Sequence, residues 1–66
     1  MKEIKCIYEN GEEKILPYDI LGKQMEGIIK AIKQKKGFRY VRFLESPLQK
    51  IYIDGELVVD KGVLNE

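Results

Sequence analysis

The chain opens with two strand-like runs, both before residue 18, in which apolar and polar residues alternate. Between them lies Asn10-Gly11, a pair that strongly favours a tight β-hairpin turn because both residues tolerate positive φ angles. With these two residues as the whole loop, we expect Cys6 to lie opposite Ile15. One face of the hairpin is then predicted to be buried, and it contains Ile4, Cys6, Tyr8 and Ile15.

The next segment has apolar residues at helical spacing. Pro17 ends the second strand, Asp19 is suited to cap a helix, and Gly37 is typical of the position just past a helix end. The spacing predicts an amphipathic helix over residues 20–36. Its apolar stripe is expected to pack on the sheet and consists of Leu21, Met25, Ile28 and Ile32, with Ile29 at its margin.

Two glycines, Gly22 and Gly27, fall inside this predicted helix. An interior glycine costs a helix up to about 1 kcal/mol relative to alanine. Each is therefore either a tolerated weakness or a place where a partner approaches the helix closely.

The last third of the chain reads as three further strands. Residues 38–44 are rich in aromatic and β-branched residues, which favour a strand. After a turn at residues 45–47, residues 48–53 and 56–59 form a second predicted hairpin around Asp54-Gly55. We expect residues 61–66 to be a terminal tail. The predicted cross-strand pairs of the second hairpin are Ile51 with Val58 and Tyr52 with Leu57.

These elements predict one α+β domain that spans residues 1–66. About five strands in the order β-β-α-β-β-β form a small antiparallel sheet, and one amphipathic helix packs on one of its faces. Both faces of the hairpin between Leu48 and Val59 are apolar. That hairpin is therefore either covered on both sides within the fold or turned on one side toward a second subunit.

Charge is distributed unevenly along the chain. The formal net charge is only +1, but residues 23–42 contain seven cations and one acid, Glu26, which gives this block a net charge of +6. The segments before and after it are mildly acidic. A positive block between acidic ends points to an anionic partner more clearly than the near-neutral total does.

The composition argues against most enzymes. The chain has no histidine and one cysteine, Cys6, so it lacks the commonest general base near neutral pH and any Cys-His pair. We expect no enzyme activity, no metal site, no cofactor and no small-molecule site, and we expect Cys6 to be a buried core residue. The acids Asp54, Glu56 and Asp60 lie close together, but an Asp-Gly turn accounts for their position.

The sequence also favours a location in the cytoplasm, away from membranes. No apolar run approaches the roughly 20 residues of a membrane span, and the N-terminal residues lack the apolar region of a signal peptide. A lone cysteine agrees with a reducing compartment.

Residues 36–43, KGFRYVRF, resemble the ribonucleoprotein octapeptide of RNA-recognition-motif domains and depart from it where Arg39 replaces a small residue. In that family the octapeptide is a strand whose outward aromatic residues stack on RNA bases. The resemblance implies roles for six residues: stacking for Phe38 and Tyr40, phosphate contact for Lys36 and Arg42, and core packing for Val41 and Phe43.

The rest of the chain departs from that family. Its octapeptide follows the second strand of a fold with two helices, whereas residues 36–43 here follow the only predicted helix. The companion hexapeptide of the family is also poorly matched by residues 7–11, IYENG. We therefore assign no family and retain only the physical combination of cations with aromatic rings.

The leading hypothesis from the sequence is a small non-enzymatic module that binds RNA or single-stranded nucleic acid through the predicted helix-to-strand junction. The alternative is a protein-interaction or regulatory module, homo-oligomeric through the C-terminal hairpin. A plainer interpretation is that the rings lie in the core and the lysines only solvate the helix end. The candidate nucleic-acid-binding residues are Lys30, Lys33, Lys35, Lys36, Phe38, Arg39, Tyr40 and Arg42.

Overall fold

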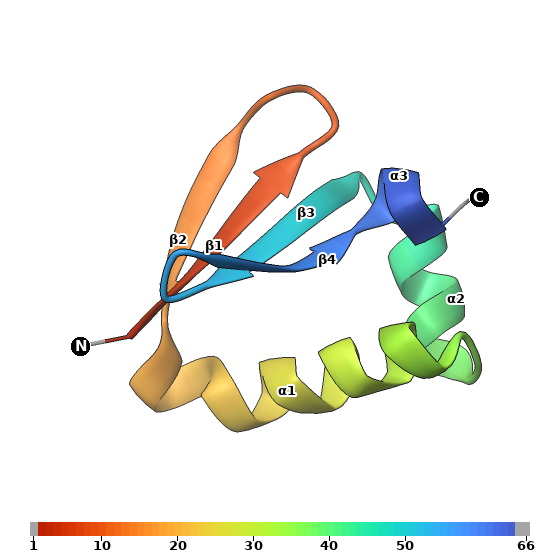
Figure 1. Cartoon of the computed structure of the whole chain (residues 1–66), viewed down its shortest axis with the longest axis horizontal. Helices are drawn as coiled ribbons and strands as arrows, with labels where there is room; N and C mark the ends of the chain where they lie inside the picture. The colour runs from red at the N-terminus through yellow and green to blue at the C-terminus, as the bar shows by residue number, and fades with distance from the viewer. Residues whose placement is uncertain (1, 65–66) are drawn as a thin grey trace.

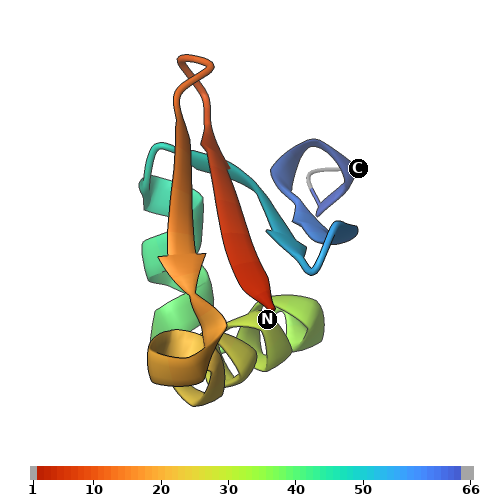
Figure 2. The same cartoon turned by 90° about the vertical axis from the view of Figure 1, so that its left-hand side faces the viewer.

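The computed structural model describes residues 2–64 and contains a four-stranded antiparallel sheet with helices beside it (Figures 1 and 2). The strand order in the sheet is β2-β1-β3-β4. The elements are β1 (Glu3–Tyr8), β2 (Glu13–Pro17), α1 (Tyr18–Gln34), α2 (Phe38–Glu45), β3 (Leu48–Ile53), β4 (Glu56–Asp60) and α3 (Lys61–Leu64). The predicted α+β class and the antiparallel pairing are confirmed.

The long helix α1 lies along one side of the sheet, and α2 runs crosswise from its C-terminal end (Figure 1). The core lies between this side of the sheet and the helices. Its buried side chains come from β1, α1, α2, β3 and β4, and they are Ile4, Cys6, Ile29, Ile32, Phe43, Ile51 and Val59.

The main correction to the sequence-based fold concerns residues 38–44, which form the helix α2 and not a strand. Tyr40 and Phe43 are three residues apart, so a helix turns both toward the core, where Phe43 is buried and Tyr40 packs beside it. The apolar positions of this short segment fit both the helical period of about 3.6 residues and the strand period of about two. The pattern alone therefore does not decide between a helix and a strand. The sheet described for residues 2–64 accordingly has four strands, and the chain order is β-β-α-α-β-β-α.

The first hairpin forms, but its register is shifted by one residue from the prediction. The Tyr8 N–H donates to the Glu12 carbonyl at 2.9 Å, so Tyr8 lies opposite Glu12 and the loop has three residues, 9–11, instead of two. Cys6 consequently pairs with Lys14, and Leu16 pairs with Ile4. A shift of one residue turns a strand over. Ile15, which was predicted to be buried, is therefore 57% exposed, while Leu16 packs against the core.

The second hairpin agrees closely with its prediction. Asp54 and Gly55 both have positive φ angles, 52° and 83°, as a two-residue hairpin turn requires. Tyr52 pairs with Leu57 as expected, but Ile51 pairs with Val59 and not with Val58 because the register shifts there. This bulge places the Val59 side chain in the core.

The predicted terminal tail is partly wrong. Residues 61–64 form α3, and Lys61 is only 6% exposed. Its Nζ donates to the Ser46 carbonyl at 2.6 Å and to Glu9 Oε1 at 3.1 Å, and it lies 5.1 Å from the centre of the Phe43 ring. Lys61 thus joins the first loop, the turn after α2 and the C-terminal segment. Residues 65–66 of the predicted tail lie outside the described residues.

Candidate functional site

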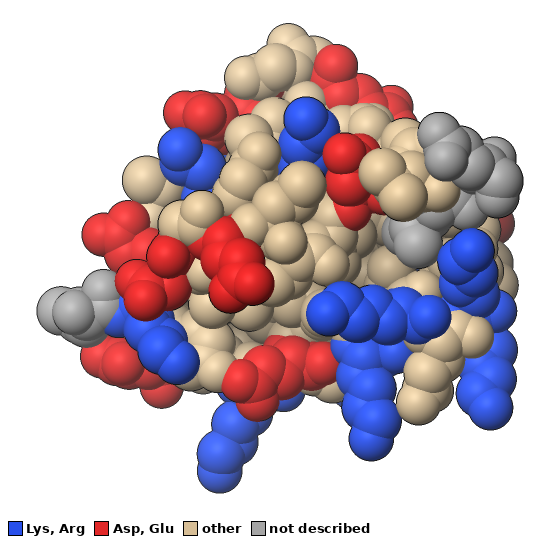
Figure 3. Space-filling view, in the orientation of Figure 1, with Lys and Arg blue, Asp and Glu red and all other residues tan. Residues whose placement is uncertain are grey.

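Six exposed cations gather where α1 ends and α2 begins, and we call this surface the basic corner. In Figure 3 the blue side chains cluster over the C-terminal half of α1 and over α2, whereas most red side chains lie over the sheet and the start of α1. The basic corner consists of Lys30, Lys33, Lys35, Lys36, Arg39 and Arg42, all of them exposed.

The positive charge of the basic corner is not balanced by acids within residues 2–64. The ion pairs found there join Lys5 to Glu13 and Lys61 to Glu9, and neither involves a cation of the corner. No acidic residue occurs in the sequence between Glu26 and Glu45. All six cations therefore attract an approaching anion, and their attractions add.

The turn between the two helices is built on two residues with positive φ angles. Lys35 ends α1 in the left-handed conformation, with φ at 54°, and its N–H donates to the Ile32 carbonyl. Gly37 has φ at 92° and ψ at 171°, a region that essentially only glycine occupies, and it precedes the first residue of α2. The predicted helix end at residues 36–37 is therefore two residues late.

The N-terminal end of α2 adds to the positive potential of the corner. This end has no capping side chain and no acidic residue in its first turn. Its free N–H groups carry the positive end of the helix dipole. The corner thus combines formal charges from two helices and the turn between them with a partial charge from the backbone.

The structure separates the two aromatic residues that were predicted to share one exposed face. Phe38 is 73% exposed, whereas Tyr40 is half-buried and packs against the core. On a helix, Phe38 shares a face with Arg42, one turn further along, and the Arg42 guanidinium lies 5.5 Å from the ring centre. Val41, which the octapeptide resemblance placed in the core, is 48% exposed.

Arg39 crosses from α2 to the surface of α1 at Gly27. A Cβ atom added to Gly27 would lie 2.6 Å from Arg39 Nη1, so the guanidinium occupies the space above this glycine. The close approach considered from the sequence is therefore made by a side chain of the same protein.

A pocket of about 420 Å³ opens beside the basic corner, between α1, α2 and the start of β3. Its surface is mainly apolar, with Arg39 and Arg42 among the residues around it. The sequence did not reveal it, because with residues 38–44 as a strand these side chains do not converge. The lining residues are Ile28, Phe38, Arg39, Arg42, Phe43, Ser46 and Leu48.

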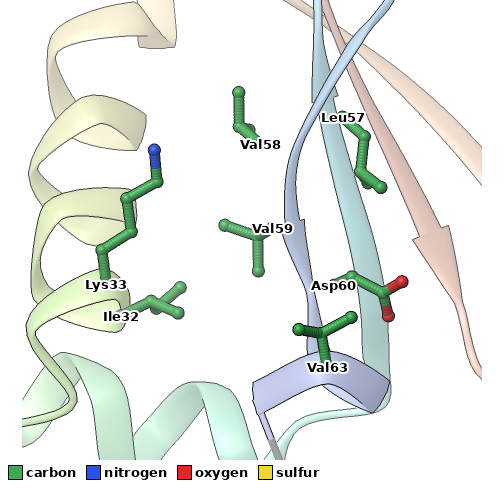
Figure 4. Close-up of a pocket in the computed structure, with 7 residues that line it drawn as sticks. All are labelled: Ile32, Lys33, Leu57, Val58, Val59, Asp60 and Val63. Atoms are coloured by element: carbon green, nitrogen blue, oxygen red, sulfur yellow. The ribbon is translucent and has the colours of Figure 1, made fainter.

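A second hollow of about 260 Å³ lies between α1 and the edge strand β4. In Figure 4, Val58 and Val59 extend toward α1, whereas Leu57 and Asp60 extend to the other side of β4. Leu57 and Val63 remain 44% and 62% exposed. This part of the molecule presents apolar side chains and no cluster of cations.

Groups with perturbed acidity lie away from the basic corner. Burial raises the pKa of the Cys6 thiol, and the nearby Lys14 lowers it by less. The hydrogen bond from the Tyr18 hydroxyl to Glu26 raises the pKa of Tyr18. At neutral pH the buried Cys6 is therefore a protonated core thiol and a poor nucleophile.

Within residues 2–64 no three His, Cys, Asp or Glu side chains come together as a metal site would require. None of the helices in that range combines the length and the apolar character needed to cross a bilayer.

Comparisons with protein-family models, with curated proteins and with solved structures found no significant match to this chain.

Proposed function

We propose that this protein is a small non-enzymatic module that binds RNA or single-stranded DNA through the basic corner. The observation that carries the proposal is the set of six exposed cations on two adjoining helices and the turn between them. They are unpaired with any acid in residues 2–64 and lie beside the exposed Phe38. Cations that track a phosphate backbone, with an aromatic ring for base stacking, are the usual elements of single-strand binding.

The proposed binding surface has one exposed aromatic ring and not the two that the octapeptide resemblance implied. Phe38 supplies the aromatic surface, and Tyr40 packs against the core. The binding residues that we assign are therefore Lys30, Lys33, Lys35, Lys36, Phe38, Arg39 and Arg42, and Tyr40 supports them from the core side.

Charge neutralisation tests the proposal. A triple variant, Lys33→Gln, Lys35→Gln and Lys36→Gln, removes half of the cations of the corner without touching the core. Each phosphate contact with a single strand contributes about −0.7 to the slope of log K against log salt concentration, so three lost contacts should flatten that slope by about 2. Fluorescence anisotropy with a labelled single-stranded oligonucleotide measures the slope.

The matched control removes the same total charge elsewhere. Lys2, Lys14 and Lys50 lie outside the basic corner, so their triple change to glutamine should leave most of the affinity and the slope in place. Equal loss of affinity in the two triple variants would contradict the proposal, because it would show that only net charge matters.

A second candidate function is self-association or protein interaction through the C-terminal hairpin. It is favoured by the exposed outer side chain of Leu57 and by the position of β4 at the edge of the sheet. An edge strand has unpaired backbone groups that another chain can use. Light scattering at increasing concentration should then show a dimer that Leu57→Lys disrupts, whereas a strict monomer would exclude the self-association form.

A further inference from the structure

We propose that the pocket beside the basic corner receives one unstacked base of a single-stranded nucleic acid, with the adjoining phosphates held by Arg39 and Arg42. This inference rests on the proposed function and specifies the part of the ligand that each region contacts. It extends the stacking already assigned to Phe38 to a base-recognition site lined by residues of α1, α2 and β3.

The walls of the pocket suit a flat apolar group. Ile28 comes from α1, Phe43 from α2 and Leu48 from β3, and the exposed ring of Phe38 stands at the opening. The volume of about 420 Å³ lies in the range of roughly 300–1,000 Å³ that small-molecule sites occupy. An aromatic base can therefore enter between side chains that the fold already holds in place.

The polar groups at the pocket favour a ligand that has many hydrogen-bond acceptors. Arg39 and Arg42 bring only hydrogen-bond donors, and no Asp or Glu lines the pocket. The Ser46 hydroxyl already donates to the Phe43 carbonyl at 2.7 Å and accepts from the Leu48 N–H at 3.3 Å. The main hydrogen-bond donors that the pocket offers to a ligand are therefore the two guanidinium groups. They match phosphate oxygens in geometry and charge.

The position of the pocket favours a polynucleotide over an isolated small anion. The two arginines that border it belong to the basic corner, which continues over the lysines at the end of α1. A chain with a phosphate at each nucleotide can place one base in the pocket and further phosphates on those lysines. In a duplex every base is stacked and paired, so a base enters only from a single strand or after it is unpaired.

The test compares two labelled oligonucleotides of ten nucleotides with identical phosphates: one carries bases throughout, and the other is abasic at its internal positions. At about 50 mM salt, we expect the wild-type protein to bind the base-containing strand about 10-fold more tightly, in line with the measured strength of base–aromatic stacking. Phe38→Ala should reduce this preference to less than about 2-fold, while binding of the abasic strand stays nearly constant.

Two control variants make the comparison specific. Phe38→Trp retains an aromatic ring and should retain the preference. Val41→Ala shortens another exposed apolar side chain of α2 that does not line the pocket, and it should also leave the preference intact. Because Phe38 is 73% exposed, its replacement removes little core packing, and circular dichroism confirms that each variant is folded.

The possible failures are distinguishable. Equal, salt-dependent binding of the two strands by the wild-type protein would overturn the base pocket and leave the proposed function standing. Retention of the preference by Phe38→Ala would likewise overturn the pocket. Absence of binding to both strands would overturn the proposed function and the pocket with it.

Discussion

The direction of α2, and therefore the shape of the basic corner, depends on the backbone at Lys35 and Gly37. Both residues have positive φ angles, but only Gly37 combines φ at 92° with an extended ψ of 171°. A Cβ atom is strongly disfavoured in that region. No neighbouring atom lies within 4 Å of the place where a Cβ would stand, so the constraint comes from the backbone alone.

We therefore predict that Gly37→Ala lowers the free energy of unfolding by about 1–3 kcal/mol, the cost of holding a non-glycine residue in this conformation. Chemical denaturation measures the change. Lys36→Ala is the neighbouring control, and because Lys36 is exposed and unpaired with acids in residues 2–64, its effect should stay within about 0.5 kcal/mol. Equal effects of the two variants would contradict this account of the turn.

Cys6 is expected to make the free energy of unfolding depend on pH in the alkaline range. The folded protein raises the pKa of the thiol through burial, so it holds the proton more tightly than the unfolded chain, whose thiol has a pKa of about 8.5. The stabilising contribution is fully present below that pH and is lost as the pH rises through the folded-state pKa.

We predict that the unfolding free energy of the wild-type protein decreases more between pH 7 and pH 10 than that of Cys6→Ala. The variant has a smaller side chain in the core and is less stable at both pH values, so the informative quantity is the difference between the two slopes. Urea denaturation at a series of pH values provides it. Parallel slopes would show that the thiol does not titrate with unfolding.

At the scale of elements, the register of the first hairpin decides which face of β2 packs on the core. The alternation of residues indicated two strands and a turn at Asn10-Gly11, and this much is confirmed. The loop length is set by hydrogen bonds of the loop itself, including that from the Glu12 N–H to Asn10 Oδ1. A pattern of alternation cannot specify that length, so the buried and exposed residues of β2 were interchanged.

Side-chain truncation in β2 tests this register. We predict that Leu16→Ala lowers the unfolding free energy by about 1–2 kcal/mol because Leu16 packs against the core, whereas Ile15→Ala changes it by less than about 0.5 kcal/mol. Thermal and chemical unfolding both report the difference. A larger loss for Ile15→Ala would restore the register inferred from a two-residue loop.

The basic corner could be predicted only in part, because some of its features are local in the sequence and others depend on tertiary contacts. The charge block and the long helix follow directly from the sequence, because charge and helical period are local properties. The state of residues 38–44 depends on the contact of Tyr40 and Phe43 with the core and on Arg39 lying over Gly27. Those contacts join residues distant in the sequence, so the pocket and the different exposure of Phe38 and Tyr40 could be seen only in the fold.

At the scale of the whole molecule, Lys61 holds the end of the chain against the turn that follows α2. Its buried ammonium group contacts the Ser46 carbonyl, a carboxylate oxygen of Glu9 and the face of the Phe43 ring. Ser46 and Phe43 also line the proposed base pocket. Through Lys61, the C-terminal segment therefore contacts two of the residues that line this pocket.

We predict that Lys61→Met, which keeps most of the aliphatic stem but removes the donor, lowers the unfolding free energy by about 1–2 kcal/mol because the Ser46 carbonyl loses its partner. Glu9→Gln should cost less than about 1 kcal/mol, since the Glu9 side chain is 53% exposed and the ion pair is screened by water. A cost for Glu9→Gln as large as that for Lys61→Met would assign the stabilisation to the ion pair instead.

The central claim is that the basic corner binds a single-stranded nucleic acid, and the most direct measurement is affinity against salt concentration. A labelled single-stranded oligonucleotide is titrated with the wild-type protein at about 50, 100 and 200 mM monovalent salt. With four to six phosphates contacted, log K should fall linearly against log salt concentration with a slope of about −3 to −4. Absence of binding at about 50 mM salt, or an affinity independent of salt, would contradict the account.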